Sequence, residues 1–147
     1  MSELVRGVEG MRARAEALVK ELAPTNHATI VTLSGELGAG KTTFVQGLAR
    51  ALGVEERVTS PSFVIEKIYL LPRGPFKKMV HVDADRLKSA HELEILGWNE
   101  LVAEADTLVL LEWPERVLDI IPASAHRIVL THVDENTRSF SYDSSQK

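Results

Sequence analysis

The most constraining feature of the sequence is GELGAGKTT, residues 35–43, which places three glycines before a lysine and two threonines. An apolar, β-rich run, ATIVTLS (28–34), precedes it, and TTFVQGLARALG (42–53) follows it with apolar residues at helical spacing. The segment therefore predicts a buried strand, a turn with unusual backbone freedom, and an amphipathic helix, in that order.

The same stretch fits the phosphate-loop pattern G-x-x-x-x-G-K-[ST], and it has the strand before and the helix after that this motif requires. Glycines allow successive N–H groups to point at a phosphate, and the helix beginning near Lys41 adds its positive dipole end. Lys41 is then expected to contact the β- and γ-phosphates, and the Thr42 hydroxyl to bind Mg²⁺. The alternative is a glycine-rich turn with an incidental lysine. The predicted nucleotide-binding residues of the loop are Glu36, Leu37, Gly38, Ala39, Gly40, Lys41, Thr42 and Thr43.

Two acidic residues follow apolar strands and are candidates for metal and water chemistry. Asp83 comes directly after MVHV, and Glu112 comes directly after TLVLL. In a parallel α/β sheet the carboxyl ends of strands open into the ligand crevice, so both side chains could converge on the glycine loop. Glu112 resembles a Walker B acid, and Asp83 could hold a metal-bound water or act as the base. The alternative is that each acid caps a strand end or pairs with a nearby cation, and the sequence leaves open which acid holds the metal.

The other segments predict an α/β domain with three layers and a mixed, mostly parallel sheet flanked by helices. We expect residues 1–147 to form one domain with an N-terminal helix within 1–24 and a frayed tail at 143–147. The expected helices are 9–23, 42–53 and 89–105, the last broken near Gly97, and the expected strands are 28–34, 62–71, 77–83, 107–114, 126–133 and 138–143. Two of these pairs, 62–71 with 77–83 and 126–133 with 138–143, are predicted to be antiparallel.

Composition excludes several classes of protein. The net charge is −4, there is no cysteine, and no apolar run approaches the length of a membrane-spanning helix. A disulfide framework is excluded, and the basic stretch PRGPFKK (72–78) is too short to offer a tRNA-sized surface. The charged N-terminus does not resemble a signal peptide. We therefore expect a cytoplasmic protein with no membrane partner.

Beyond the glycine loop, the segments VTSPSF (58–63), HVDADRL, ELEILG and LEWPERV occur in an order that resembles the TsaE (YjeE) family. These are small bacterial P-loop ATPases needed to make threonylcarbamoyladenosine in tRNA. The resemblance covers about residues 35–122, and its TSPSF and EWPE segments are more specific than the phosphate loop alone. It implies a mixed seven-stranded sheet, ATP and Mg²⁺ as cofactors, and TsaD- and TsaB-type partners, with tRNA contacted only indirectly.

The resemblance also implies roles for individual residues. Thr59 belongs to a switch-like loop, Asp83 to the acid of the family's HxDxYR segment, and Glu112 with Trp113 to its EWP site. Together with the phosphate-loop pattern and the strand-end acids, these segments predict that Lys41, Asp83 and Glu112 are catalytic and that Thr42, Glu112 and Asp83 bind the metal. Thr59 and Trp113 are predicted to join the nucleotide site, with an ordinary Thr/Ser/Pro-rich loop and core packing as their respective alternatives. His81 also matches the family segment, whereas Asp85 stands where the family usually has tyrosine.

Two other function classes remain open at this level. A stand-alone small nucleotide kinase shares the phosphate loop, but such enzymes normally carry an arginine-bearing lid, and no Arg-rich insertion follows the loop helix. The second class is a regulatory module that binds nucleotide without hydrolysing it. Phosphate release without an acceptor separates a hydrolase from both.

Overall fold

The computed structural model describes residues 2–36, 39–54, 66–72 and 74–144. Its strands are β1 (Ser2–Arg6), β2 (Thr29–Ser34), β3 (Glu66–Leu70), β4 (Lys78–Asp83), β5 (Thr107–Glu112), β6 (His126–Asp134) and β7 (Thr137–Ser144). Its α-helices are α1 (Gly7–Glu21), α2 (Lys41–Ala51), α3 (Ala90–Ile95) and α4 (Trp98–Val102), and two 3₁₀ turns cover Pro114–Arg116 and Leu118–Ile120. None of these helices has the length and apolar character required to cross a bilayer.

The strands form one mixed sheet in the order β1-β7-β6-β2-β5-β4-β3. The four central strands β6, β2, β5 and β4 run parallel to one another, whereas the pairings β3 with β4, β6 with β7 and β1 with β7 are antiparallel. The seven-stranded sheet and both predicted antiparallel pairs are therefore confirmed. Parallel strands are confined to the centre, where β2 and β5 are buried along almost their whole length.

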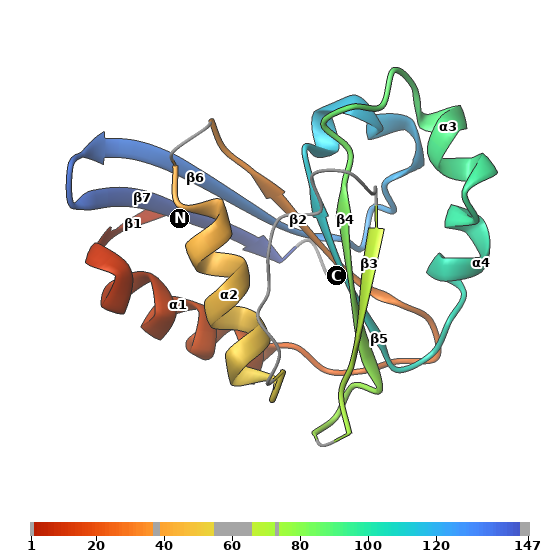
Figure 1. Ribbon diagram of the computed structural model, residues 1–147, viewed down its shortest axis with the longest axis horizontal. Helices are drawn as coiled ribbons and strands as arrows, with labels where there is room; N and C mark the ends of the chain where they lie inside the picture. The colour runs from red at the N-terminus through yellow and green to blue at the C-terminus, as the bar shows by residue number, and fades with distance from the viewer. Residues whose placement is uncertain (1, 37–38, 55–65, 73, 145–147) are drawn as a thin grey trace.

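Alternating residues of the central strands supply two separate cores. Val31 and Leu110 pack with α1 and α2, whereas Val109 and Val80 pack with α3 and α4. Because side chains of a strand alternate between the two faces of its sheet, these clusters lie on opposite faces. Figure 1 shows the two helix pairs on either side of the central strands, and the expected three-layer arrangement is confirmed.

The N-terminal prediction needs correction. Residues 2–6 are not helical but form β1, which pairs with β7 from Ser2 opposite Ser141 to Arg6 opposite Thr137. Only Val5 of β1 is buried, so the short edge strand lacks the alternating apolar pattern by which strands are predicted. At the other end, Asp143 and Ser144 belong to β7, and 145–147 lie outside the described residues.

The helix 89–105 is divided as predicted, with Gly97 at φ 98° between α3 and α4. Strand 107–114 ends earlier than expected, at Glu112, because Trp113 adopts a left-handed conformation. Strand 62–71 is described only from residue 66 onward. Helix 42–53 begins one residue earlier, at Lys41, and Gly53 follows it with φ 94° as a helix stop.

Helix α1 packs closely on α2, because Gly47 of α2 faces α1. A Cβ at Gly47 would lie 3.1 Å from the Arg12 Cα and 3.2 Å from the Ala15 Cβ. Met11, Ala15 and Leu18 are the buried residues of α1 in this layer. The contact fixes α2, and with it Gly40 directly before α2, against α1.

We expect Gly47→Leu to lower the free energy of unfolding by about 1–3 kcal/mol, the usual cost of overpacking. Leucine favours helix more than glycine does, so any loss must come from the clash with α1. Urea denaturation measures the change, and Arg50→Ala, at an exposed position of the same helix, is the control. A Gly47→Leu protein as stable as the control would show that the helix contact is looser than described.

Candidate functional site: a glycine loop beside two strand-end acids

The register of the parallel strands brings the glycine loop and both acids together. Leu33, two residues before Gly35, lies beside Glu112, and Glu112 lies beside Asp83 in the next strand. The Ala84 N–H also donates a 3.1 Å hydrogen bond to the Glu112 carbonyl. The convergence expected from the sequence is therefore confirmed at the carboxyl ends of β2, β5 and β4.

Glycine is required at positions 35 and 40 of the loop for different structural reasons. Gly40 has φ 99° and immediately precedes α2, a conformation that residues with a Cβ rarely adopt. A Cβ at Gly35 would lie only 2.8 Å from the Leu130 carbonyl oxygen of β6. Gly35 is thus required by the close approach of a neighbouring strand. Leu37 and Gly38, predicted to bind nucleotide, lie outside the described residues.

The N-terminus of α2 is suited to an anion. No side chain in the described part of the chain caps it, and its first turn contains no acidic residue. The first N–H groups of an α-helix have no partner within the helix, and the helix dipole adds partial positive charge there. Glu36 and Thr42 are exposed, Thr43 is partly exposed, and Ala39 is buried.

Lys41 is 8% exposed, which is unusual for a lysine. Its Nζ lies 3.9 Å from the centroid of the Trp113 ring, a cation–π contact between the first residue of α2 and the residue after β5. Trp113 holds φ 59° and ψ 51°, a left-handed conformation that is rare for a bulky side chain. Such outliers persist where the surrounding structure requires them, and this one turns the chain directly after Glu112.

The two acids have different surroundings. Glu112 is 5% exposed, and its Oε2 lies 2.5 Å from Nε2 of the buried His81. Asp83 is partly exposed, and its Oδ1 accepts a 3.0 Å hydrogen bond from the Asp85 N–H. Burial raises the pKa of Asp83 above the usual value, and the charges of Glu112 and Asp85 raise it further, while the Asp85 N–H and His81 oppose the shift.

Asp85, which replaces the family tyrosine, is exposed. One of its carboxylate oxygens lies 3.9 Å from an Arg116 guanidinium nitrogen, and both side chains are about half exposed. An exposed pair at this distance contributes little to stability. The hydrogen bond that the Asp83 Oδ1 accepts comes from the backbone N–H of Asp85 itself.

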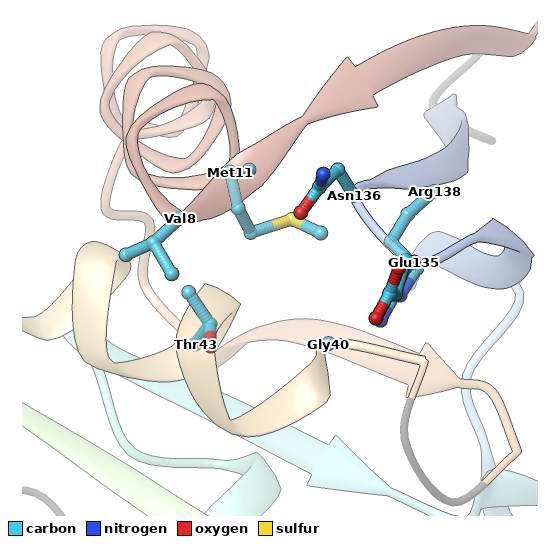
Figure 2. Close-up of a pocket in the computed structure, with 8 residues that line it drawn as sticks. Val8, Met11, Gly40, Thr43, Glu135, Asn136 and Arg138 are labelled. Atoms are coloured by element: carbon cyan, nitrogen blue, oxygen red, sulfur yellow. The ribbon is translucent and has the colours of Figure 1, made fainter.

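A pocket of about 150 Å³ adjoins the start of α2, and sequence reasoning missed it. It is lined by Gly7, Val8, Met11, Gly40, Thr43, Glu135, Asn136 and Arg138. Figure 2 shows side chains from α1, α2 and the turn between β6 and β7 facing this space. The Gly7 N–H donates a 2.7 Å hydrogen bond to the Asn136 carbonyl, and the Arg138 guanidinium donates to the Asp134 carbonyl at 2.6 Å. Residues from both ends of the chain are thereby held beside the phosphate loop.

The donors present fit Mg²⁺ and a phosphorylated ligand. The Thr42 hydroxyl and the Glu112 and Asp83 carboxylates are hard oxygen donors of the kind that Mg²⁺ prefers. Within the described ranges, no three His, Cys, Asp or Glu side chains gather as a preformed metal cage. Thr59, predicted to join the site, lies outside the described residues.

We expect Asp83→Asn to raise the free energy of unfolding at pH 7. Because the folded-state pKa of Asp83 is raised, the folded protein binds more protons than the unfolded chain between the two pKa values, and stability falls as pH rises through that window. The amide removes this penalty and keeps an oxygen for the Asp85 N–H. The gain should shrink as pH falls toward the unfolded carboxyl pKa of about 3.9.

Urea denaturation over this pH range measures the effect, with Asp119→Asn at an exposed position as the control. If Asp83→Asn proved less stable than wild type at pH 7, the carboxylate would be favourable in the fold and the assigned cause of its shift would be wrong.

Comparison with known proteins agrees with this architecture. The family described as "Threonylcarbamoyl adenosine biosynthesis protein TsaE" matches residues 6–140. A structure of Bacillus subtilus YdiB superimposes with a TM-score of 0.75 and 26% identity, covering 99% of this chain and 86% of that one.

Three curated relatives are each named tRNA threonylcarbamoyladenosine biosynthesis protein TsaE. The Haemophilus influenzae protein is 32% identical over 82% of this chain and 73% of its own length. The Borreliella burgdorferi protein is 38% identical over 63% of this chain, and the Streptomyces coelicolor protein 48% identical over 58%. The matched region spans 65% and 57% of the lengths of these last two relatives. Because the family match includes the glycine loop, both strand-end acids and nearly the whole sheet, this chain belongs to the TsaE family.

Proposed function

We propose that this chain binds and hydrolyses ATP with Mg²⁺, as a subunit that supports threonylcarbamoyladenosine modification of tRNA through TsaD- and TsaB-type proteins. The observation that carries the proposal is the register that sets the phosphate loop, Glu112 and Asp83 side by side. Membership of a family named for this modification supports the tRNA pathway.

The loop N–H groups and Lys41 hold the β- and γ-phosphates. Buried Lys41 contacts an aromatic face and, within the described part of the chain, forms no salt bridge with a carboxylate, so its charge remains available to an arriving anion. The base and ribose enter the pocket beside Gly40 and Thr43, because that cavity continues from the start of α2. Trp113, in contact with Lys41, is placed to report nucleotide binding through its fluorescence.

The two acids, Glu112 and Asp83, have different roles in this proposal. Glu112, buried and hydrogen-bonded by His81, together with the Thr42 hydroxyl, binds Mg²⁺, which neutralises phosphate charge when bound. Asp83, with no side-chain partner among the described residues and a raised pKa, orients the attacking water and accepts its proton. A pKa moved toward the working pH makes a carboxylate a stronger base. Asp83→Asn should therefore hydrolyse ATP about 10²-fold more slowly, even though we expect it to be more stable.

The surface charges support indirect contact with tRNA. In the basic stretch 72–78, the Lys78 Nζ lies 2.6 Å from a Glu104 oxygen, and the Lys77 Nζ lies 3.7 Å from an Asp106 oxygen. These carboxylates offset the charge that a phosphate backbone would need, and the net charge of the chain is −4. The chain acts on its partners and leaves tRNA recognition to them.

We expect Lys41→Ala to abolish measurable ATP hydrolysis and to weaken ATP binding severely, because it removes the cation at the start of α2. Phosphate release without an added acceptor and calorimetric ATP binding are the measurements, and Lys88→Ala, an exposed lysine, is the control. Wild-type turnover in Lys41→Ala would show that the glycine loop is not the site of ATP hydrolysis. ATP binding without phosphate release in the wild type would favour a regulatory module, and release only with an acceptor would favour a kinase.

We also expect the isolated chain to retain no tRNA at moderate salt, and to be captured by TsaD- and TsaB-type proteins from the same organism when ATP is present. Filter binding at two salt concentrations tests the first expectation, and a pull-down with and without ATP tests the second. Tight, salt-sensitive tRNA binding by the chain alone, or threonylcarbamoyl transfer without partners, would contradict the subunit role.

A further inference from the structure

The buried pair of His81 and Glu112 is not explained by the phosphate loop itself. His81 lies on β4 two residues before Asp83 and is 1% exposed. Its Nε2 lies 2.5 Å from Oε2 of Glu112, and among the described residues no other side chain bonds this carboxylate. The strands that carry the two residues are adjacent and parallel, with His81 opposite Leu110, so the contact crosses from one strand to the end of the next.

The hydrogen bonding of the His81 ring is one-sided. A carboxylate accepts hydrogen bonds, so the proton of the ring lies on Nε2. The other nitrogen, Nδ1, is buried and has no partner in the described part of the chain. Buried side-chain nitrogens normally find partners, and leaving one unpaired costs stability. The ring is therefore oriented so that Nε2 bonds Glu112 while Nδ1 is left without a partner among the described residues. This arrangement distinguishes His81 from a histidine held only by core packing.

We propose that His81 is a positioning residue for the metal-binding carboxylate, an inference that rests on the proposed function. By donating to Oε2, His81 fixes the Glu112 side chain and occupies one of its oxygens, which leaves the other oxygen to the cation. Hydrogen-bond partners that orient a metal ligand are typically worth about 10–100-fold in metal affinity. His81 contributes through Glu112 and makes no contact with nucleotide.

Three substitutions separate positioning from packing. His81→Gln can keep a donor, because the glutamine Nε2 reaches about as far from the backbone as the histidine Nε2. His81→Asn places its amide nitrogen where the histidine Nδ1 stands, too short to reach Glu112. His81→Leu is a second variant without a donor, and its apolar side chain suits the buried position, so the comparison holds if His81→Asn fails to fold. Thermal unfolding followed by circular dichroism confirms that each variant is folded.

The measurement is calorimetric ADP binding at a series of Mg²⁺ concentrations, with a matched series in EDTA. We expect the Mg²⁺ concentration for half-maximal enhancement of ADP binding to rise about 10-fold or more in His81→Asn and His81→Leu. It should stay near the wild-type value in His81→Gln, and ADP binding in EDTA should be unchanged in all three. In a Glu112→Gln background the same His81 substitutions should add nothing, because two residues that act as one unit are not additive.

Equal Mg²⁺ dependence in His81→Gln and His81→Asn, no shift in any donor-free variant, or full additivity with Glu112→Gln would overturn the positioning role. These outcomes leave the proposed function intact, provided the wild-type chain binds ADP more tightly with Mg²⁺. If the wild type shows no Mg²⁺ dependence, the proposed cation site falls and the positioning role falls with it.

Discussion

The parallel pairing of β2, β5 and β4 is the constraint on which the rest of the site depends. The glycine loop, Glu112 and Asp83 are widely separated in sequence. They meet at the carboxyl ends of the central strands only because these strands are parallel and paired in one register. A shift by one residue would turn Glu112 and Asp83 to the opposite face of the sheet. Burial on both faces prevents such a shift, because the alternating side chains of these strands fill two different cores. The packing of the helices is thus also what aligns the polar groups.

The site concentrates features that cost folding energy. A lysine is buried against an aromatic ring, a tryptophan holds a left-handed backbone, and two carboxylates stand at neighbouring strand ends. Desolvation and like charges disfavour the ionised form of Asp83, and a buried nitrogen of His81 has no partner among the residues that the structure describes. Around these groups the sheet interior is mostly apolar, and the burial of its side chains offsets the free-energy cost of the site. An arriving cation and polyphosphate would offset several of these costs together.

Sequence reasoning reached the central architecture because its signals are local. The glycine loop, the apolar strands and the acids directly after them are encoded in short contiguous stretches, and the register brings them together as expected. The signals that failed are non-local. β1 has one buried residue and depends on pairing with β7, and the pocket combines Gly7, Met11 and Arg138 from opposite ends of the chain. The orientation of His81 toward Glu112 needs the register of two strands, which no single segment specifies.

The pairing of β1 with β7 also bears on how the molecule matures during synthesis. The glycine loop leaves the ribosome before β7 does, and domains tend to fold as units once enough chain has emerged. Yet the wall of the pocket beside Gly40 includes Asn136 and Arg138. In addition, β1, which directly precedes Gly7, can pair only after β7 has been synthesised, and the Gly7 N–H bonds the Asn136 carbonyl. A nascent chain that already carries the loop, helix α2 and both acids therefore still lacks one side of this pocket. Completion of the pocket therefore follows the synthesis of the loop, helix α2 and both acids, and it waits for β7.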